Sequence, residues 1–146
     1  KFIDFCLAFI ILFGLLMYYG YYPNVNYLYL PLLIILLVAT VLGIGLWLSA
    51  MAIQYRDIQQ LMMFLSQLLM YAAPVIWPIS IVPEKYLTVY GLYPMVGVIE
   101  GFRAILLGYE QMPWQLIGMG SITATILLLT GIFYFRSKEY KFADVV

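Results

Sequence analysis

The chain of 146 residues is 66% hydrophobic and 10% charged, and its mean hydropathy is +1.01. An average soluble domain has about 25% charged residues, so this composition indicates an integral membrane protein, and we expect an all-α fold. Seven basic and seven acidic residues cancel, which argues against nucleic-acid binding. The lack of histidine and the single cysteine argue against a metal site and an intrachain disulfide.

The first apolar run predicts a transmembrane span over residues 2–22. About twenty residues at 1.5 Å per residue cross a hydrocarbon core of about 30 Å. The run ends in a group of tyrosines, which is typical of a membrane interface, and Pro23 and Asn24 then mark a turn. Because a span begins directly after Lys1, without a start methionine, we expect the chain to be the later part of a longer protein.

A second span is predicted over residues 28–53 from an almost purely aliphatic run. Its second half holds small residues four positions apart, at Ala39 and Gly43 and again at Gly45 and Ser49. Small residues at this spacing let helix backbones approach closely in lipid, so we expect this part to pack tightly against another helix.

The polar run of residues 54–60 interrupts the apolar sequence and predicts a loop at the membrane surface. Two interpretations remain open: an ordinary solvated turn, or a docking site for a soluble partner. A third span follows over residues 61–77, and we expect Pro74 to kink it near its far end.

The stretch from Pro74 to Gly108 is apolar enough for membrane depth, yet it is broken by prolines and carries charges. In hydrocarbon, irregular backbone and charged side chains are tolerated only where protein or a water-filled cavity covers them. We therefore expect the functional site of the chain to lie in this stretch. The candidate residues are Pro74, Pro78, Pro83, Glu84, Lys85, Pro94, Glu100 and Arg103.

The distribution of basic residues predicts that residues 79–109 enter the membrane and turn back, before a fourth span over residues 114–135. If this segment does not cross, five basic residues share one side and two lie on the other, as the positive-inside rule prefers. We therefore expect four transmembrane helices with a re-entrant pair of short helices on the outer side, between the third and the fourth. All 146 residues then form a single transmembrane domain.

Glu100 and Arg103 are three positions apart, so on a helix they share one face. They are expected either to pair with each other or to reach a second subunit.

No phosphate-binding loop or hydrolase motif occurs in the sequence, so catalysis is not expected of this chain. One alternative is a membrane enzyme acting on lipid-linked sugars, with Glu84, Glu100 or Glu110 as acid or base. Aromatic residues make up 18% of the chain, with 14 tyrosines. They form either an interfacial belt or platforms for the apolar faces of sugars.

Four segments together carry a resemblance to a known family. They are Tyr55-Arg56-Asp57, the run P-V-I-W-P-I-S-I-V-P-E-K from Pro74 to Lys85, Tyr93-Pro94-Met95 with G-V-I-E-G-F-R at Gly97 to Arg103, and the ending Phe133-Tyr134-Phe135-Arg136 to Phe142-Ala143-Asp144-Val145. In their order and spacing, the chain resembles the permease subunit of ABC-2 type exporters for polysaccharides and polyol phosphates, which serve O-antigen, capsule and teichoic-acid export.

The resemblance implies the last four spans of a six-span permease in the bacterial plasma (inner) membrane. Such permeases resemble one another in working as homodimers with a separate ATP-binding cassette subunit. That subunit holds ATP and magnesium, so no cofactor is expected in this chain. The implied substrate is a glycan or lipid-linked glycan, such as a lipopolysaccharide component. A further alternative is an ABC-2 exporter of a small hydrophobic compound.

The resemblance also implies roles for individual residues. Tyr55, Arg56 and Asp57 would couple the ATPase to the spans, and the eight candidate residues of the broken stretch would shape two gate helices facing outward. Tyr93 is a departure, because the family more often has asparagine before this proline. The resemblance therefore does not imply the cap that an asparagine would make for the second gate helix.

Overall fold

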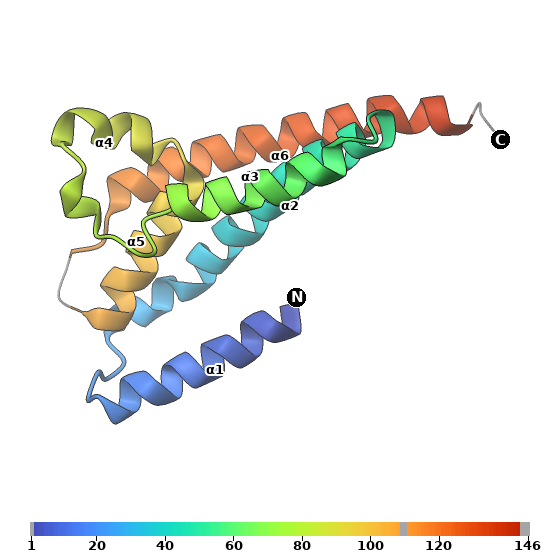
Figure 1. Cartoon of the computed structure of the whole chain (residues 1–146). Coiled ribbons are helices and arrows are strands. Elements are labelled where there is room, and N and C mark those ends of the chain that lie inside the picture. Colours follow the sequence, from blue (N-terminus) through green and yellow to red (C-terminus); the bar gives the residue numbers. More distant parts are fainter. Residues whose placement is uncertain (1, 109–110, 144–146) are drawn as a thin grey trace.

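The computed structural model describes residues 2–108 and 111–143, and within these ranges every regular element is a helix. Figure 1 shows α2 and α6 as long helices lying side by side, with shorter helices around them and α1 to one side. The elements are α1 (Phe2–Tyr18), the 3-10 turn η1 (Val25–Tyr29), α2 (Leu30–Gln54), α3 (Ile58–Ala72), the 3-10 turn η2 (Ile79–Ile81), α4 (Glu84–Gly91), α5 (Pro94–Leu107) and α6 (Trp114–Ala143). The predicted all-helical class is confirmed for the described residues.

Two helical stretches are long and apolar enough to cross a membrane, Val25–Gln54 and Trp114–Glu139. Taken together, α4 and α5 are also long and apolar enough to cross, but the two helices are bent by 108° at their junction. Helix α1 is also apolar, but its 17 residues span only about 26 Å. Length and composition therefore support two spanning helices in the described part of the chain, or three if the bent pair is one span.

Helix α3 ends at Ala72, five residues before the expected end of the third span. The prediction that Pro74 kinks a continuing helix is wrong, because the helix stops before the proline. A proline disfavours the helical conformation of the residue before it, and Ala73 is accordingly extended, with φ −76° and ψ 142°. In contrast, α6 continues to Ala143, beyond the expected end of the fourth span.

The backbones of α2 and α6 touch at glycines. A Cβ atom on Gly43 would lie 2.9 Å from the backbone nitrogen of Leu128, and one on Gly131 would lie 3.0 Å from the carbonyl oxygen of Gly43. The close packing predicted for the second half of α2 is confirmed at Gly43. It does not extend to Gly45, where a Cβ would meet nothing within 4 Å.

Helices α2 and α6 run parallel. Leu33 and Ile117, near their beginnings, belong to one buried cluster, and the rings of Trp47 and Tyr134, near their ends, stack with centroids 4.6 Å apart. We call the end where both helices begin the α4–α5 end, and the opposite end the loop end (Figure 1).

Helix α5 wedges between the first halves of α2 and α6. A Cβ on Gly97 would lie 2.7 Å from the carbonyl oxygen of Leu116, and one on Gly101 would lie 2.8 Å from the side chain of Leu33. Gly108 ends α5 in the left-handed conformation, with φ 67°, which favours glycine. The core cluster is formed by Leu33, Leu36, Val98, Ile105, Ile117 and Ala124.

Candidate functional site

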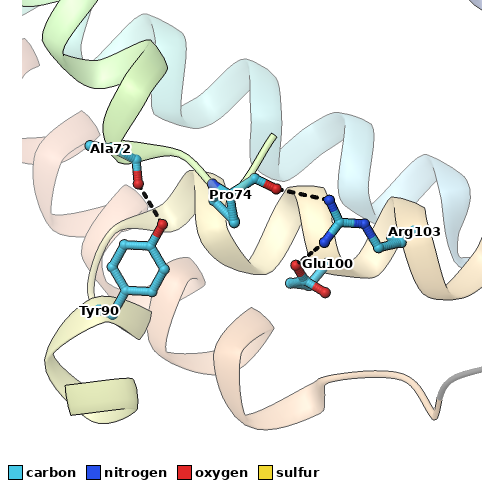
Figure 2. Close-up of polar contacts among 5 residues, drawn as sticks. All are labelled: Ala72, Pro74, Tyr90, Glu100 and Arg103. Atoms are coloured by element: carbon cyan, nitrogen blue, oxygen red, sulfur yellow. Dashed lines mark hydrogen bonds and ion pairs between the residues drawn. The ribbon is translucent and has the colours of Figure 1, made fainter. Parts of the chain in front are cut away.

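Arg103 on α5 joins two separate segments at the α4–α5 end (Figure 2). Its Nη1 donates to Oε1 of Glu100 at 2.5 Å, and its Nη2 donates to the carbonyl oxygen of Pro74 at 2.9 Å. The side chain of Glu100 is only 4% exposed, whereas that of Arg103 is 22% exposed. Of the two alternatives that the spacing left open, pairing within one chain is observed, and Arg103 also binds the segment that follows α3.

The carbonyl group of Pro74 lies two residues beyond the end of α3, outside any helix. A buried carbonyl without a hydrogen bond is costly. Pro74 is less than 2% exposed, so water does not supply this hydrogen bond. Arg103 therefore satisfies a buried acceptor and a buried carboxylate at once.

Two tyrosine hydroxyls bind further carbonyls at the end of α3. Tyr90 donates to the carbonyl oxygen of Ala72 at 2.5 Å, as Figure 2 shows, and Tyr93 donates to that of Leu69 at 3.2 Å. The Trp77 ring stacks on Tyr90, with centroids 5.5 Å apart. We call the donors Tyr90, Tyr93 and Arg103, together with the carbonyls of Leu69, Ala72 and Pro74, the carbonyl latch. It ties the end of α3 to α4 and α5 through polar contacts.

The junction between α4 and α5 carries one of the latch donors, Tyr93. Pro94 is the first residue of α5, a position that requires no backbone donor and suits the fixed φ of proline. Tyr93 precedes it in an extended conformation and makes no side-chain cap to α5. Its hydroxyl instead reaches Leu69, so the residue that departs from the family pattern has a contact of its own.

The remaining predicted gate residues lie apart from the latch contacts. Glu84 and Lys85 are exposed in the first turn of α4, and the Lys85 ammonium lies 5.7 Å from the centroid of the Tyr86 ring. Pro78 and Pro83 flank η2 on its two sides. The structure therefore brings Pro74, Glu100 and Arg103 together and leaves these four residues at the surface segment before and within α4.

Pro94 has a packing role. It is less than 2% exposed, and a Cβ on Gly120 of α6 would lie 3.0 Å from its Cα atom. The absence of a side chain at Gly120 therefore lets the start of α5 rest directly on α6.

Tyr55, Arg56 and Asp57 form an exposed turn between α2 and α3 at the loop end. An open pocket of about 450 Å³ adjoins this turn, lined by Tyr55, Asp57, Ile58, Gln60 and Leu61. Asp57 stands at the N-cap of α3 but makes no side-chain cap, so its carboxylate is not used to begin the helix. Helix α3 connects this turn directly to the carbonyl latch.

The carboxylates proposed for an enzyme lie in different surroundings. Glu84 is exposed at the start of α4, whereas Glu100 is buried and bound to Arg103. Glu110 lies outside the described residues.

Sequence reasoning missed the role of Tyr90. The available signal was indirect: a helix that ends before Pro74 leaves several carbonyls in need of donors, and the tyrosines of the next helix are suitable hydrogen-bond donors. Which tyrosine reaches them depends on the fold of η2 and α4, which the sequence pattern did not resolve.

These features define a helical membrane protein with a broken helix pair at one end and an exposed polar turn at the other. The family model for the ABC-2 type transporter matches residues 2–107, which is most of the chain. The chain belongs to this family. It is therefore a multi-pass component of a transporter in the bacterial plasma (inner) membrane.

The curated relatives are O-antigen export permeases of low identity. The chain is 23% identical over 137 residues to the O-antigen export system permease protein RfbA of Klebsiella pneumoniae, covering 93% of this chain and 52% of that protein. It is 23% identical over 132 residues to the protein of the same name in Myxococcus xanthus, covering 89% of this chain and 51% of that protein. The chain thus spans about half the length of the relatives it matches. No solved structure matches it.

Proposed function

We propose that this chain forms part of the permease of an ABC exporter that passes a lipid-linked polysaccharide or polyol phosphate outward across the bacterial plasma membrane. The observation that carries the proposal is the similarity to O-antigen export permeases over about nine-tenths of the chain, within a matching transporter family. The aromatic content and the broken helix pair are consistent with a pathway for a large, amphipathic substrate.

The proposed topology has four transmembrane helices, with α4 and α5 forming a re-entrant pair. The parallel packing of α2 and α6 supports it, because α3 already carries the chain back from the loop end to the α4–α5 end. A further complete crossing by α4 and α5 would make α6 antiparallel to α2. Both ends of α5 also lie beside the beginnings of its neighbours: Pro94 is next to Gly120, and Gly108 is close to Asn24.

In this topology the Tyr55–Asp57 turn faces the cytoplasm and the carbonyl latch faces outward. The proposed partners are an ATP-binding cassette subunit, which binds ATP and magnesium, and a second permease copy. Arg56 and Asp57 supply opposite charges on an exposed turn, which is suited to polar contacts with a soluble subunit. Helix α3 then carries a displacement of the turn to the latch as one rigid element.

The gate is proposed to be the α4–α5 pair, held closed through the latch. Tilting or sliding of α3 changes the positions of the carbonyls of Leu69, Ala72 and Pro74 relative to their donors. Since those donors lie on the α4–α5 pair, the two short helices follow α3 or separate from it. The proposal thus links ATP hydrolysis on the partner to opening on the outer side.

The coupling claim is tested by the double substitution Arg56→Ala and Asp57→Ala in the intact transporter. We expect normal membrane insertion, weaker co-purification of the ATPase subunit and reduced delivery of glycan to the cell surface. Gln59→Ala is the matched control, because Gln59 is a neighbouring exposed polar residue at the start of α3. Unchanged ATPase binding and export in the double variant would refute the docking role.

The same assay separates the substrate classes. Loss of surface glycan on deletion of the gene, with restoration by the intact permease, supports glycan export. Unchanged surface glycan, together with increased sensitivity to small hydrophobic compounds, would show instead that the substrate is a small molecule.

A further inference from the structure

A second candidate site lies at the α4–α5 end, away from the carbonyl latch. It is an open pocket of about 370 Å³, lined by Asn26, Tyr29, Gln111, Met112 and Trp114. This volume falls within the range of about 300–1,000 Å³ that is usual for small-ligand pockets. The lining comes from η1, from the segment before α6 and from the first residue of α6, so distant parts of the sequence converge on one cavity.

Two aromatic rings form perpendicular walls of this pocket. Tyr29 and Trp114 meet edge to face, with centroids 4.9 Å apart and an interplanar angle of 87°. Tyr29 is 37% exposed and Trp114 is 49% exposed, so much of each ring remains available for contact. Aromatic faces bind apolar surfaces well, and the C–H face of a sugar ring is such a surface.

The polar lining of the pocket consists of neutral amides. Asn26 and Gln111 each carry an amide donor and an amide acceptor, which suits hydroxyl groups that both donate and accept. No charged side chain is among the described residues that line the pocket. Amide groups beside aromatic faces suit a polyhydroxylated ligand.

One lining residue of the pocket and one residue next to the lining are anchored in the core. Met112 packs against the buried cluster, as does Tyr27, which lies between Asn26 and Tyr29 in η1. This anchoring limits the movement of the two segments that carry the pocket, which lowers the entropy lost on binding.

We propose that this pocket binds one sugar ring of the exported glycan as it emerges on the outer side. The ring stacks on Trp114 or Tyr29, and the amides of Asn26 and Gln111 bind its hydroxyls. This inference rests on the proposed glycan export. The competing interpretation is that Tyr29 and Trp114 are ordinary members of an interfacial aromatic belt, which would contact lipid headgroups.

The sharpest experiment places a photoreactive side chain in the pocket of the intact transporter in its host cell. Gln111→benzoylphenylalanine is expected to give an adduct that an antibody against the cell's own surface glycan detects after illumination. Tyr19→benzoylphenylalanine is the control, because Tyr19 is an exposed tyrosine, 73% accessible, in the turn after α1 and not among the residues that line the pocket. A glycan adduct at position 111 and none at position 19 supports the proposal. No adduct at 111, or equal adducts at both positions, overturns it.

A second experiment measures the rate of glycan export by variants of the pocket. Trp114→Ala is expected to slow the appearance of pulse-labelled glycan at the surface roughly threefold to tenfold, as the loss of one aromatic contact predicts, whereas Trp114→Phe keeps most of the rate. Tyr19→Ala should leave the rate unchanged. If the wild-type transporter exports glycan and Trp114→Ala does so equally fast, the pocket proposal fails alone. If the wild type exports no glycan, the proposed function fails with it.

Discussion

The α2–α6 pair and the α3–α5 region are held together by different forces. In the pair, glycine lets two backbones touch: a Cβ on Gly43 would lie 2.9 Å from the Leu128 nitrogen. In the α3–α5 region, Tyr90 and Tyr93 donate hydrogen bonds to carbonyls of α3, and Arg103 donates to the carbonyl of Pro74 just after it. Close packing dominates the first contact, to which Trp47 adds one hydrogen bond to Thr130, whereas the second consists of directional polar contacts.

This difference suits a fixed part and a moving part. Close-packed backbones resist displacement, because any shift opens a gap or creates a clash. Hydrogen bonds to carbonyls at a helix end exchange partners more readily, and each has a modest net contribution to stability, about 0.5–1.5 kcal/mol. We therefore interpret α2 and α6 as the scaffold and the latch as the contact that changes during transport.

The largest expected effect comes from Arg103→Met. This substitution leaves Glu100, whose side chain is 4% exposed, buried without its cation, and breaking such a pair costs about 3–5 kcal/mol. The double variant Glu100→Leu with Arg103→Met should recover part of this loss, because it leaves no buried charge, although the Pro74 carbonyl still lacks its donor. Denaturant unfolding of the purified protein in detergent measures both. Equal destabilisation in the single and the double variant would contradict the ion-pair explanation.

The second largest effect is expected at Gly43, where α2 contacts α6. Gly43→Ala places a methyl group against the α6 backbone and should cost about 1–3 kcal/mol, as is usual for overpacking. Gly45→Ala is the control: it meets nothing within 4 Å and should be neutral or slightly stabilising, because alanine favours helix. Thermal unfolding monitored by circular dichroism compares the two. A similar loss at both positions would mean that helix packing at Gly43 is not what holds the pair.

These two glycines also show how far the sequence predicts the fold. Spacing alone marks Gly43 and Gly45 alike, but residues two positions apart on a helix point to nearly opposite faces. Which face meets α6 depends on the three-dimensional arrangement, so the sequence identified the glycine-rich helix but not the contact. The Glu100–Arg103 pair was predictable because both residues belong to one helix and lie three positions apart.

The latch was only partly predictable, because its acceptors and donors belong to different helices. The charged and proline residues marked the region, but the sequence interpretation carried the third span to residue 77. Once α3 ends at Ala72, its last carbonyls need donors, and Tyr90 becomes important. Contacts that arise from where one helix stops and how the next turns back are not contained in the periodicity of either segment.

The smallest expected effects concern the tyrosines of the latch. Tyr90→Phe and Tyr93→Phe each remove one hydroxyl and should cost about 0.6–1 kcal/mol, since hydrogen bonds within membrane proteins are modest contributors. Tyr86→Phe is the control, because the Tyr86 hydroxyl makes no hydrogen bond among the described residues and its ring is 55% exposed. Despite the small change in stability, both latch variants should uncouple the transporter, so that the partner hydrolyses ATP at a normal rate while export falls. The ratio of glycan exported to ATP hydrolysed measures this. If the two variants lower the ratio no more than Tyr86→Phe does, the tyrosine bonds only stabilise the end of α3, and the moving contact reduces to the bond between Arg103 and Pro74.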